Sequence, residues 1–250
     1  MTSLSATKGT WVRRFHPADD AATRLVCFPH AGGSATYYFP VSQALSPGID
    51  VLAVQYPGRH ERRTEPCIDD LRRLADCVVD ELQAWTDRPL ALFGHSLGAT
   101  LAFEVALRLE AAGTVPQGLF ASGRRAPSRH REGRVHLGDD AELIATLQRM
   151  SGTDQRALAD DELLDMVLPA LRGDYKAAET YRYRPGPPLS CPLVVLTGDS
   201  DSEVTEEEAE AWREHTTGSF ARHRFTGGHF FLNTHARSVI GLIAGHPALR

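Results

Sequence analysis

The stretch Leu90-Ala-Leu-Phe-Gly-His-Ser-Leu-Gly-Ala99 decides the fold. Apolar residues lead into Gly94-His-Ser-Leu-Gly98, and residues 99–109 are rich in helix-forming side chains. This order predicts a strand, a sharp turn and a helix, with Ser96 at the centre of the turn. Because glycine has no Cβ, the two flanking glycines allow the strand and the helix to approach closely around that serine.

The turn carries the pattern G-x-S-x-G, which in an α/β sheet holds a serine hydroxyl out at the carboxyl edge. The central residue of so sharp a turn is expected to adopt a strained backbone conformation. N–H groups at the start of the following helix favour the negative charge that develops on an attacked carbonyl oxygen. The pattern predicts that Ser96 is a nucleophile, although a chain with 21 glycines also allows an ordinary turn with a bystander serine.

The chain has 250 residues, of which 42% are hydrophobic and 24% charged, as is typical of a soluble globular protein. This length suits a single α/β domain over residues 1–250. A net charge of −5 argues against nucleic acid as the main partner. The first residues contain no apolar signal segment, and no apolar stretch approaches the length that crosses a bilayer. We therefore expect a cytoplasmic protein with no membrane partner.

The four cysteines form no C-x-x-C pair and no zinc-binding spacing, so they predict no metal site. Cys27 and Cys191 lie in or beside apolar runs, where a buried free thiol is expected. No cysteine lies on a turn like that of Ser96, so a catalytic cysteine is poorly supported.

Further apolar runs predict the other strands of a mostly parallel sheet. They are Trp11–Phe15 at an edge, Arg24–Phe28, Ile49–Val54, Pro116–Ser122, Cys191–Gly198 and Ser219–Phe225. Apolar residues at helical spacing and helix-forming composition predict helices over Cys67–Trp85, Ala99–Leu109, Glu206–Thr216 and Ala236–Ala244. A helix that connects two strands implies parallel pairing, so the sequence predicts an α/β fold with a central sheet flanked by helices.

Residues 126–188, between two of these strands, lack the pattern of a strand. Apolar side chains predict helices at Ala141–Met150 and Glu162–Arg172, and Pro169 is expected to kink or divide the second. A third segment, Gly173–Tyr183, carries three tyrosines that we expect beside a substrate channel. The insertion is too long for a simple crossover, so we interpret it as a helical lid; helices that merely cover the sheet are the alternative.

A glycine-rich loop, Pro29-His-Ala-Gly-Gly-Ser34, follows the strand at Arg24–Phe28. It matches neither of the phosphate-binding patterns G-x-x-x-x-G-K-[ST] and G-x-G-x-x-G. It lies one βαβ unit before Ser96, where a hydrolase of this fold supplies an N–H group to the oxyanion hole. We favour that role over a plain turn.

A nucleophilic serine needs a histidine base, and the histidine needs an acid that orients it. In this fold they follow the serine as Asp or Glu and then His, each on a loop after a strand. His229 follows the last predicted strand, whereas His215, His223 and His235 fall within predicted helices or a strand. His95 flanks the serine but points elsewhere in such a turn, so His229 is the preferred base.

The acid has two candidates, Asp199 and Asp201, which both follow the strand at Cys191–Gly198. Asp199 comes directly after the strand and is well placed for an Asx-type turn, so we expect it to shape the loop. Asp201 is therefore the preferred partner of His229.

A basic cluster, Arg59, Arg62 and Arg63, follows a Pro-Gly turn after the strand at Ile49–Val54. Three arginines within five residues form either a solvated loop or a docking patch for an anionic partner. The sequence leaves both interpretations open.

Several segments of the chain form a set. They are Phe28-Pro-His-Ala-Gly-Gly-Ser34, Gln55-Tyr-Pro-Gly-Arg59, Gly94-His-Ser-Leu-Gly-Ala99, Leu168-Pro-Ala-Leu-Arg172, Gly198-Asp-Ser-Asp201 and Gly228-His-Phe-Phe-Leu232. Together they resemble the type II thioesterases, the stand-alone editing enzymes of modular polyketide and nonribosomal peptide synthesis. The first two segments carry most of the specificity, because G-H-S-L-G-A occurs in many hydrolases.

The resemblance implies an α/β-hydrolase fold, a helical lid over an acyl pocket, and no cofactor. It implies Ser96, Asp201 and His229 as the catalytic triad, with the backbone N–H groups of Ala31 and Leu97 as the oxyanion hole. The implied reaction is hydrolysis of aberrant or stalled acyl thioesters from the phosphopantetheine arm of an acyl or peptidyl carrier protein, through an acyl-serine.

Carrier proteins of this kind are typically acidic, so the resemblance implies a carrier protein as the anionic partner of the basic cluster. One departure from the family is the pair Ser202-Glu203, where such enzymes often have proline after the aspartate. Two other functions remain open: a carboxylesterase or lipase acting on small oxygen esters, and a non-catalytic binding module on a hydrolase scaffold. The complete set of serine, aspartate and histidine argues against the binding module.

Overall fold

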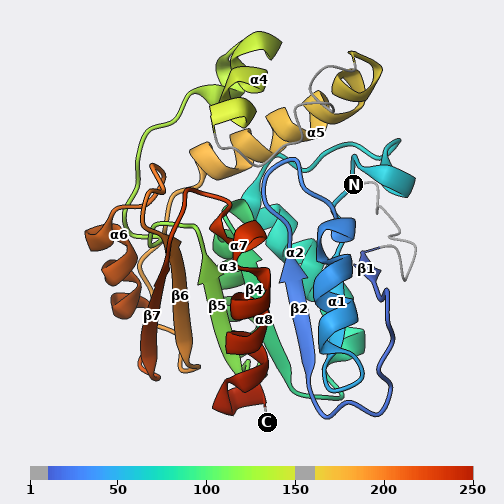
Figure 1. The fold of residues 1–250 in the computed structure, drawn as a ribbon, viewed down its shortest axis with the longest axis vertical. Helices are drawn as coiled ribbons and strands as arrows, with labels where there is room; N and C mark the ends of the chain where they lie inside the picture. The colour runs from blue at the N-terminus through green and yellow to red at the C-terminus, as the bar shows by residue number, and fades with distance from the viewer. Residues whose placement is uncertain (1–10, 150–160, 250) are drawn as a thin grey trace.

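The computed structural model describes residues 11–149 and 161–249, whose strands form one seven-stranded sheet in the order β1-β3-β2-β4-β5-β6-β7 (Figure 1). The strands are β1 (Val12–Arg13), β2 (Arg24–Phe28), β3 (Asp50–Val54), β4 (Leu90–His95), β5 (Gly118–Ser122), β6 (Leu193–Gly198) and β7 (Phe220–Phe225). β1 pairs with β3 in antiparallel fashion, and all other neighbours in this sheet are parallel. The predicted α/β fold with a mostly parallel sheet is confirmed.

Helices cover both faces of the sheet, and two more lie over the carboxyl ends of its strands (Figure 1). One face is covered by α1 (Phe39–Leu45) and α8 (Ala236–Gly245), and the other by α2 (Leu71–Leu82), α3 (Leu97–Ala111) and α6 (Glu206–Glu210). The helices over the carboxyl ends are α4 (Asp140–Arg149) and α5 (Asp161–Thr180), and a short α7 (Phe231–Thr234) precedes α8.

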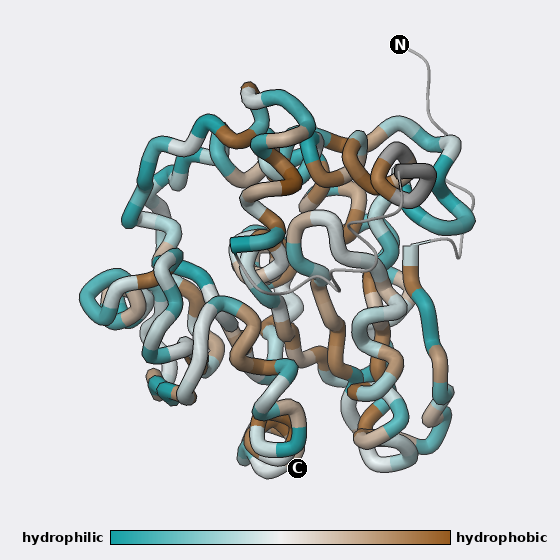
Figure 2. Tube along the Cα trace, turned by 45° about the horizontal axis from the view of Figure 1, so that its top comes forward, coloured by the Kyte–Doolittle hydropathy of each residue, from teal (hydrophilic) through white to brown (hydrophobic). Residues whose placement is uncertain are grey.

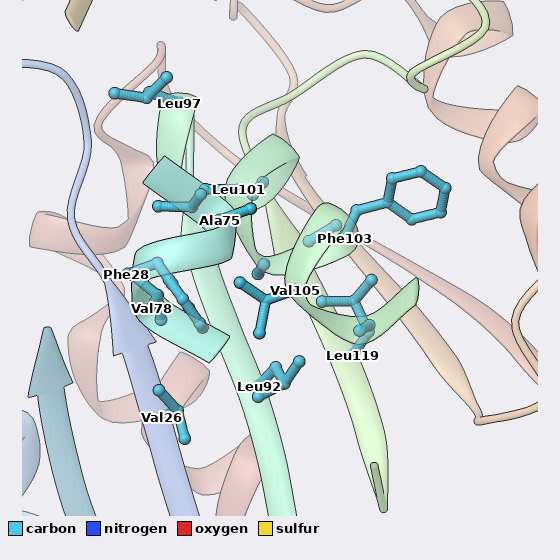
Figure 3. Close-up of a cluster of buried hydrophobic side chains, with 14 of the residues drawn as sticks. Val26, Phe28, Ala75, Val78, Leu92, Leu97, Leu101, Phe103, Val105 and Leu119 are labelled. Carbon is cyan, nitrogen blue, oxygen red and sulfur yellow. The ribbon is translucent and has the colours of Figure 1, made fainter. Parts of the chain in front are cut away.

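The central strands are buried on both faces, which explains their continuous apolar runs. Alternate side chains face opposite ways: Val26 and Leu92 belong to the cluster under α2 and α3, and Leu25 and Phe93 to the cluster on the other face. Figure 3 shows the first cluster, in which side chains of α2 and α3 pack on those of the strands. Figure 2 shows hydrophobic segments on the central strands and hydrophilic segments in many surrounding loops.

Helix boundaries differ from the sequence predictions in several places. The helix expected over Cys67–Trp85 begins only at Leu71, because the side chain of Asp70 accepts a hydrogen bond from the N–H of Arg73 and caps α2. The helix expected at residues 206–216 ends at Glu210 and continues as a 3₁₀ helix. α1 and α7, of seven and four residues, are too short for helical periodicity to identify and were not predicted.

The expectation that Pro169 divides its helix is wrong. α5 continues through Pro169 and Gly173 to Thr180, so the third segment predicted after Arg172 is part of the same helix. Pro169 is exposed, so the carbonyl group that loses its N–H partner can bind water instead. Met150, the predicted end of the preceding helix, lies outside the described residues.

Cys27 and Cys191 are buried free thiols, as expected. Burial raises the pKa of Cys191 to about 12. Within residues 11–149 and 161–249, no three His, Cys, Asp or Glu side chains are grouped so that they could hold a metal ion. None of the helices in these two ranges has both the length and the apolar character that a membrane span requires.

Candidate active site

Ser96 lies in the turn between β4 and α3, with φ of 55° and ψ of −119°. Residues other than glycine rarely adopt a positive φ, so the backbone strain expected from the sequence is present. A Cβ on Gly94 would lie 2.1 Å from the carbonyl oxygen of Gly98, and one on Gly98 would lie 2.1 Å from that of Phe28. Close backbone packing therefore requires both glycines of the G-x-S-x-G pattern.

Two backbone hydrogen bonds hold Ser96 in this conformation. Its N–H donates to the carbonyl oxygen of Ser122 at 2.8 Å, and its carbonyl oxygen accepts from the N–H of Ala99 at 3.0 Å. The first bond continues the pairing of β4 with β5, and the second lies at the start of α3. Ser96 lines a cavity of about 370 Å³.

Asp201 and His229 are buried and joined by a hydrogen bond. Nδ1 of His229 lies 3.0 Å from Oδ2 and 3.1 Å from Oδ1 of Asp201. Nε2 of His229 has no hydrogen-bond partner among the described residues, and His229 lines the same cavity as Ser96. A ring that donates Nδ1–H to the carboxylate keeps Nε2 free to accept a proton, which is the form that a general base needs.

Asp199 is exposed and holds its own loop. Its Oδ1 accepts hydrogen bonds from the N–H of Gly227 and the hydroxyl of Ser200, both at 2.9 Å. These bonds, with the bond from Gly227 as the larger cause, lower the pKa of the Asp199 carboxyl. Asp201 instead points inward, and its Oδ1 also accepts from the N–H of Glu203 at 2.9 Å. The backbone N–H of Glu203 thus helps to hold the acid.

Two other histidines pack near His229. The ring centroid of His95 lies 4.9 Å from that of His229, and its Nδ1 lies 3.0 Å from Oγ of Ser122. Burial lowers the pKa of His95 well below its ordinary value and that of His30 to about 3. Both rings are therefore neutral at neutral pH, and the hydrogen bond to an acid distinguishes His229 from them.

Three side chains of the Q-Y-P-G-R segment form hydrogen bonds to the backbone of the glycine-rich loop and of Ala35, the residue that follows it. They are Gln55 (to the Ala35 N–H, 2.9 Å), Tyr56 (to the Pro29 carbonyl, 3.0 Å) and Arg59 (to the Gly33 carbonyl, 2.8 Å). Ala31, in the middle of this loop, lines the cavity together with Leu97, the first residue of α3. Both residues predicted to form the oxyanion hole thus lie at the cavity that Ser96 lines.

Asp174 of α5 ties the same loop to the helices over the sheet. Its Oδ2 accepts from the N–H of Gly32 at 2.8 Å and forms a buried ion pair with Arg59. Leu171, one turn earlier, packs on Gly32, where a Cβ would lie 2.9 Å from Cδ1 of the leucine. The sequence carries no local signal for the role of Asp174, because its partners lie 142 and 115 residues away along the chain.

The prediction of a docking patch at Arg59, Arg62 and Arg63 is wrong for the first two. Arg59 is buried with Asp174, and the guanidinium of Arg62 is buried and paired with Glu65. Carboxylates and carbonyl oxygens that accept the guanidinium hydrogens make such burial possible. Arg63 is exposed, and a single exposed arginine does not make a patch.

The tyrosines and leucines of the insertion have different roles. Tyr175 and Leu147 line the cavity. Tyr181 instead donates its hydroxyl to Oε1 of Glu104 at 2.7 Å, and Tyr183 packs on the side chain of Phe103. Three other leucines of α4 and α5 pack with one another; they are Leu143, Leu168 and Leu171. Of the expected channel tyrosines, Tyr175 has the predicted position.

A family model described as the thioesterase domain matches residues 23–246. The chain belongs to the thioesterase family. It is 51% identical over 245 residues to thioesterase PikA5 of Streptomyces venezuelae, a match that covers 97% of this chain and 87% of that protein.

Solved structures give the same result. The type II thioesterase BorB from the borrelidin biosynthetic cluster is 53% identical, with a TM-score of 0.92 and coverage of 98% of this chain and 100% of that one. YbtT, a type II thioesterase from the yersiniabactin NRPS/PKS biosynthetic pathway, is 34% identical, with a TM-score of 0.86 and coverage of 96% and 100%. These matches confirm the resemblance to type II thioesterases, and the protein is a hydrolase of thioesters.

Removal of Asp174 from the thioesterase is expected to lower both stability and activity. Asp174→Ala leaves the buried Arg59 cation unpaired, which costs about 3–5 kcal/mol of unfolding free energy. Its kcat should also fall, because the loop that contains Ala31 loses the bond between Gly32 and α5. Urea denaturation and steady-state hydrolysis of an acyl thioester measure the two effects.

The matched control is Asp69→Asn, which breaks the exposed ion pair between Asp69 and Lys176 of the same helix. Exposed pairs contribute at most about 1 kcal/mol, so this variant should resemble the wild type. Equal losses in the two variants would contradict the role assigned to Asp174.

Proposed function

We propose that the thioesterase hydrolyses aberrant or stalled acyl thioesters on the phosphopantetheine arm of acyl or peptidyl carrier proteins in polyketide or nonribosomal peptide biosynthesis. The observation that carries the proposal is a cavity lined by Ser96, His229, Ala31 and Leu97 in a chain whose relatives belong to such pathways. Carrier proteins of these pathways work in the cytoplasm, which is where we propose that the enzyme acts.

In the first half-reaction, the Ser96 hydroxyl attacks the thioester carbonyl and Nε2 of His229 accepts its proton. The carboxylate of Asp201 orients the ring and stabilises the imidazolium. The N–H groups of Ala31 and Leu97 receive the negative charge on the carbonyl oxygen. Collapse of the tetrahedral intermediate breaks the C–S bond, and the His229 imidazolium gives its proton to the departing sulfur. The pantetheine thiol leaves, the acyl group stays on the serine, and His229 is neutral again.

In the second half-reaction, water attacks the acyl-serine and His229 again accepts a proton. The carboxylic acid leaves, and the Ser96 hydroxyl is restored. A thiolate is a good leaving group, so its protonation contributes little to the first half-reaction. Stabilisation of the oxyanion and entry of water are therefore the demanding parts of the reaction.

In this proposal, α4 and α5 act as a lid inserted at residues 126–188 of a single domain. Support comes from their position over the carboxyl ends of the strands (Figure 1) and from Leu147 and Tyr175, which line the cavity. The side chains of a lid contact the acyl chain and so influence which chain lengths are accepted.

The competing function is a carboxylesterase that acts on small oxygen esters. Pentanoyl-pantetheine and the oxygen ester of the same acyl group and arm distinguish the two. We expect kcat/KM for the thioester to exceed that for the ester by at least about 10-fold, which corresponds to about 1.4 kcal/mol of preferential transition-state stabilisation. A clear preference for the oxygen ester would favour the carboxylesterase, and Ser96→Ala gives the background rate for both substrates.

A further inference from the structure

The loop that carries Asp201 has weak backbone hydrogen bonds at the acid itself. The N–H of Asp201 lies 3.4 Å from the carbonyl oxygen of Gly198, and the N–H of Val204 lies 3.4 Å from that of Asp201. The N–H of Glu203, by contrast, donates to Oδ1 of Asp201 at 2.9 Å. Hydrogen bonds weaken as they lengthen, so the position of the Glu203 backbone matters to the carboxylate of the acid.

Arg125 binds the backbone of Glu203 from the neighbouring strand. It follows the end of β5 at Ser122, and β5 pairs with β6, the strand before the acid loop. Nε and Nη2 of Arg125 both donate to the carbonyl oxygen of Glu203, at 3.2 and 2.9 Å. Nη2 also lies 3.1 Å from Oε2 of Glu203. The guanidinium therefore binds both the main chain and the side chain of this residue.

Arg125 is itself held in place. Its side chain is 12% exposed. The carbonyl oxygen of Arg124 accepts from Nε1–H of Trp212 at 2.8 Å, and the N–H of Ala126 donates to the carbonyl oxygen of Glu208 at 3.1 Å. Hydrogen bonds thus fix the main chain on both sides of Arg125, so its guanidinium can serve as a rigid support.

The charge of Arg125 also acts on the surroundings of the acid. Burial is the main cause that lowers the pKa of the Arg125 guanidinium, and the positive charge of Arg131 adds to it. Negative charges oppose this change, and they belong to Glu203, Glu208 and Asp201. An arginine stays charged at neutral pH, so a cation lies close enough to Asp201 for the two charges to interact.

These contacts form a continuous path from Arg125 to the catalytic base. Arg125 binds the carbonyl group of Glu203, and the N–H of Glu203 binds Asp201. Asp201 in turn accepts from Nδ1 of His229 at 3.0 Å. Catalytic groups tolerate little displacement, since an error of about 1 Å can cost about 10²-fold in rate. A shift of the Glu203 backbone should therefore reach the base.

We propose that Arg125 is a positioning residue of the thioesterase: by fixing the Glu203 backbone, it keeps the Asp201 carboxylate aligned with the catalytic base. The inference rests on the proposed function, because it requires that Asp201 orients His229. Arg125 lines the cavity, so direct contact with the substrate is the competing role. Substrate binding and the reactivity of Ser96 distinguish the two roles.

The first test is the kinetics of Arg125→Gln on an acyl-pantetheine thioester. Glutamine lacks the charge and the paired donors, so kcat should fall about 10- to 100-fold while KM changes by less than about 3-fold. The rate at which a small fluorophosphonate labels Ser96 should fall by a similar factor, since this probe reports the reactivity of the triad. A raised KM with labelling at the wild-type rate would mean substrate contact and would overturn the proposal.

A second test asks whether Arg125 acts through Asp201. When two residues act through one path, the second substitution costs little after the first. The double variant of Arg125→Gln and Asp201→Asn should therefore have a kcat within about 2-fold of that of Asp201→Asn alone. If Arg125→Gln costs the same factor in both backgrounds, the two residues act independently and the proposal is wrong.

Two further variants and a control sharpen the assignment, with a melting temperature for each. Arg125→Lys should give an intermediate kcat, because it keeps the charge and loses the paired donors, and it carries the same comparisons if Arg125→Gln does not fold. Glu203→Gln keeps both backbone contacts and loses a partly exposed ion pair, so it should cost less than Arg125→Gln. The opposite order of these two losses would contradict a role through the backbone. Arg129→Gln is the control, since it breaks only an exposed pair with Glu214 and should resemble the wild type.

The Asp201→Asn enzyme separates this proposal from the proposed function. A wild-type rate in Asp201→Asn would contradict the mechanism of the proposed function, and the positioning role would fall with it. A large loss in Asp201→Asn, together with wild-type turnover and labelling in Arg125→Gln, would contradict the positioning role alone.

Discussion

The Ser96→Ala enzyme folds like the wild type and loses at least about 10³-fold in kcat/KM for an acyl-pantetheine thioester. Alanine keeps the Cβ that the turn already accommodates at a φ of 55°, and the backbone bonds to Ser122 and Ala99 do not involve the hydroxyl. The substitution therefore removes the nucleophile and little else.

Steady-state kinetics and a thermal melt test this expectation together. The melting temperature should change by only a few degrees, as is usual when no core packing is lost. The oxyanion-hole donors and the binding cavity remain, so a small residual rate above that of water is expected. A stable variant that keeps more than about a tenth of the wild-type activity would show that another group attacks the thioester.

The second large effect is expected at Asp201. Asp201→Asn replaces one carboxylate oxygen by an NH₂ group, which donates hydrogen bonds and accepts none. The Nδ1–H of His229 can then lose its acceptor, and the ring can lose the tautomer in which Nε2 acts as a base. A loss in kcat of about 10³- to 10⁴-fold is expected from comparable triads. The melting temperature of each variant must accompany the rates, because Asp201 is buried.

Asp199→Asn is the matched control, two residues away on the same loop. Asn keeps an oxygen that accepts from the N–H of Gly227, and the side chain is exposed, so activity should fall by no more than a few fold. If Asp199→Asn proves the more damaging of two well-folded variants, the assignment of the acid is wrong.

The sequence predicts the parts of this fold whose signals are local. The apolar run before Gly94 and the helix formers after Gly98 identify a strand and a helix, and the close backbone contacts of both glycines explain the pattern between them. Asp201 and His229 follow strands β6 and β7, which are neighbours in the sheet. Parallel neighbours end at the same edge, so residues after their ends meet.

Contacts between distant segments are not visible in a local pattern. The residues around Arg59 in the sequence have the composition of a solvated loop. Only the fold brings Arg59 into contact with Asp174 of α5. The continuity of α5 has a similar cause, because the local cost of Pro169 is outweighed by the packing of Leu168 and Leu171 on either side of it. Tertiary contacts thus determine both the burial of Arg59 and the continuity of α5.

The central claim is that thioester hydrolysis proceeds through Ser96, and labelling with a fluorophosphonate tests it most directly. We expect one label per chain on the peptide that contains Ser96, loss of thioesterase activity in parallel with labelling, and no label on Ser96→Ala. A fully labelled Ser96 in an enzyme that still hydrolyses acyl-pantetheine would contradict the claim, as would inactivation with the label on a different residue.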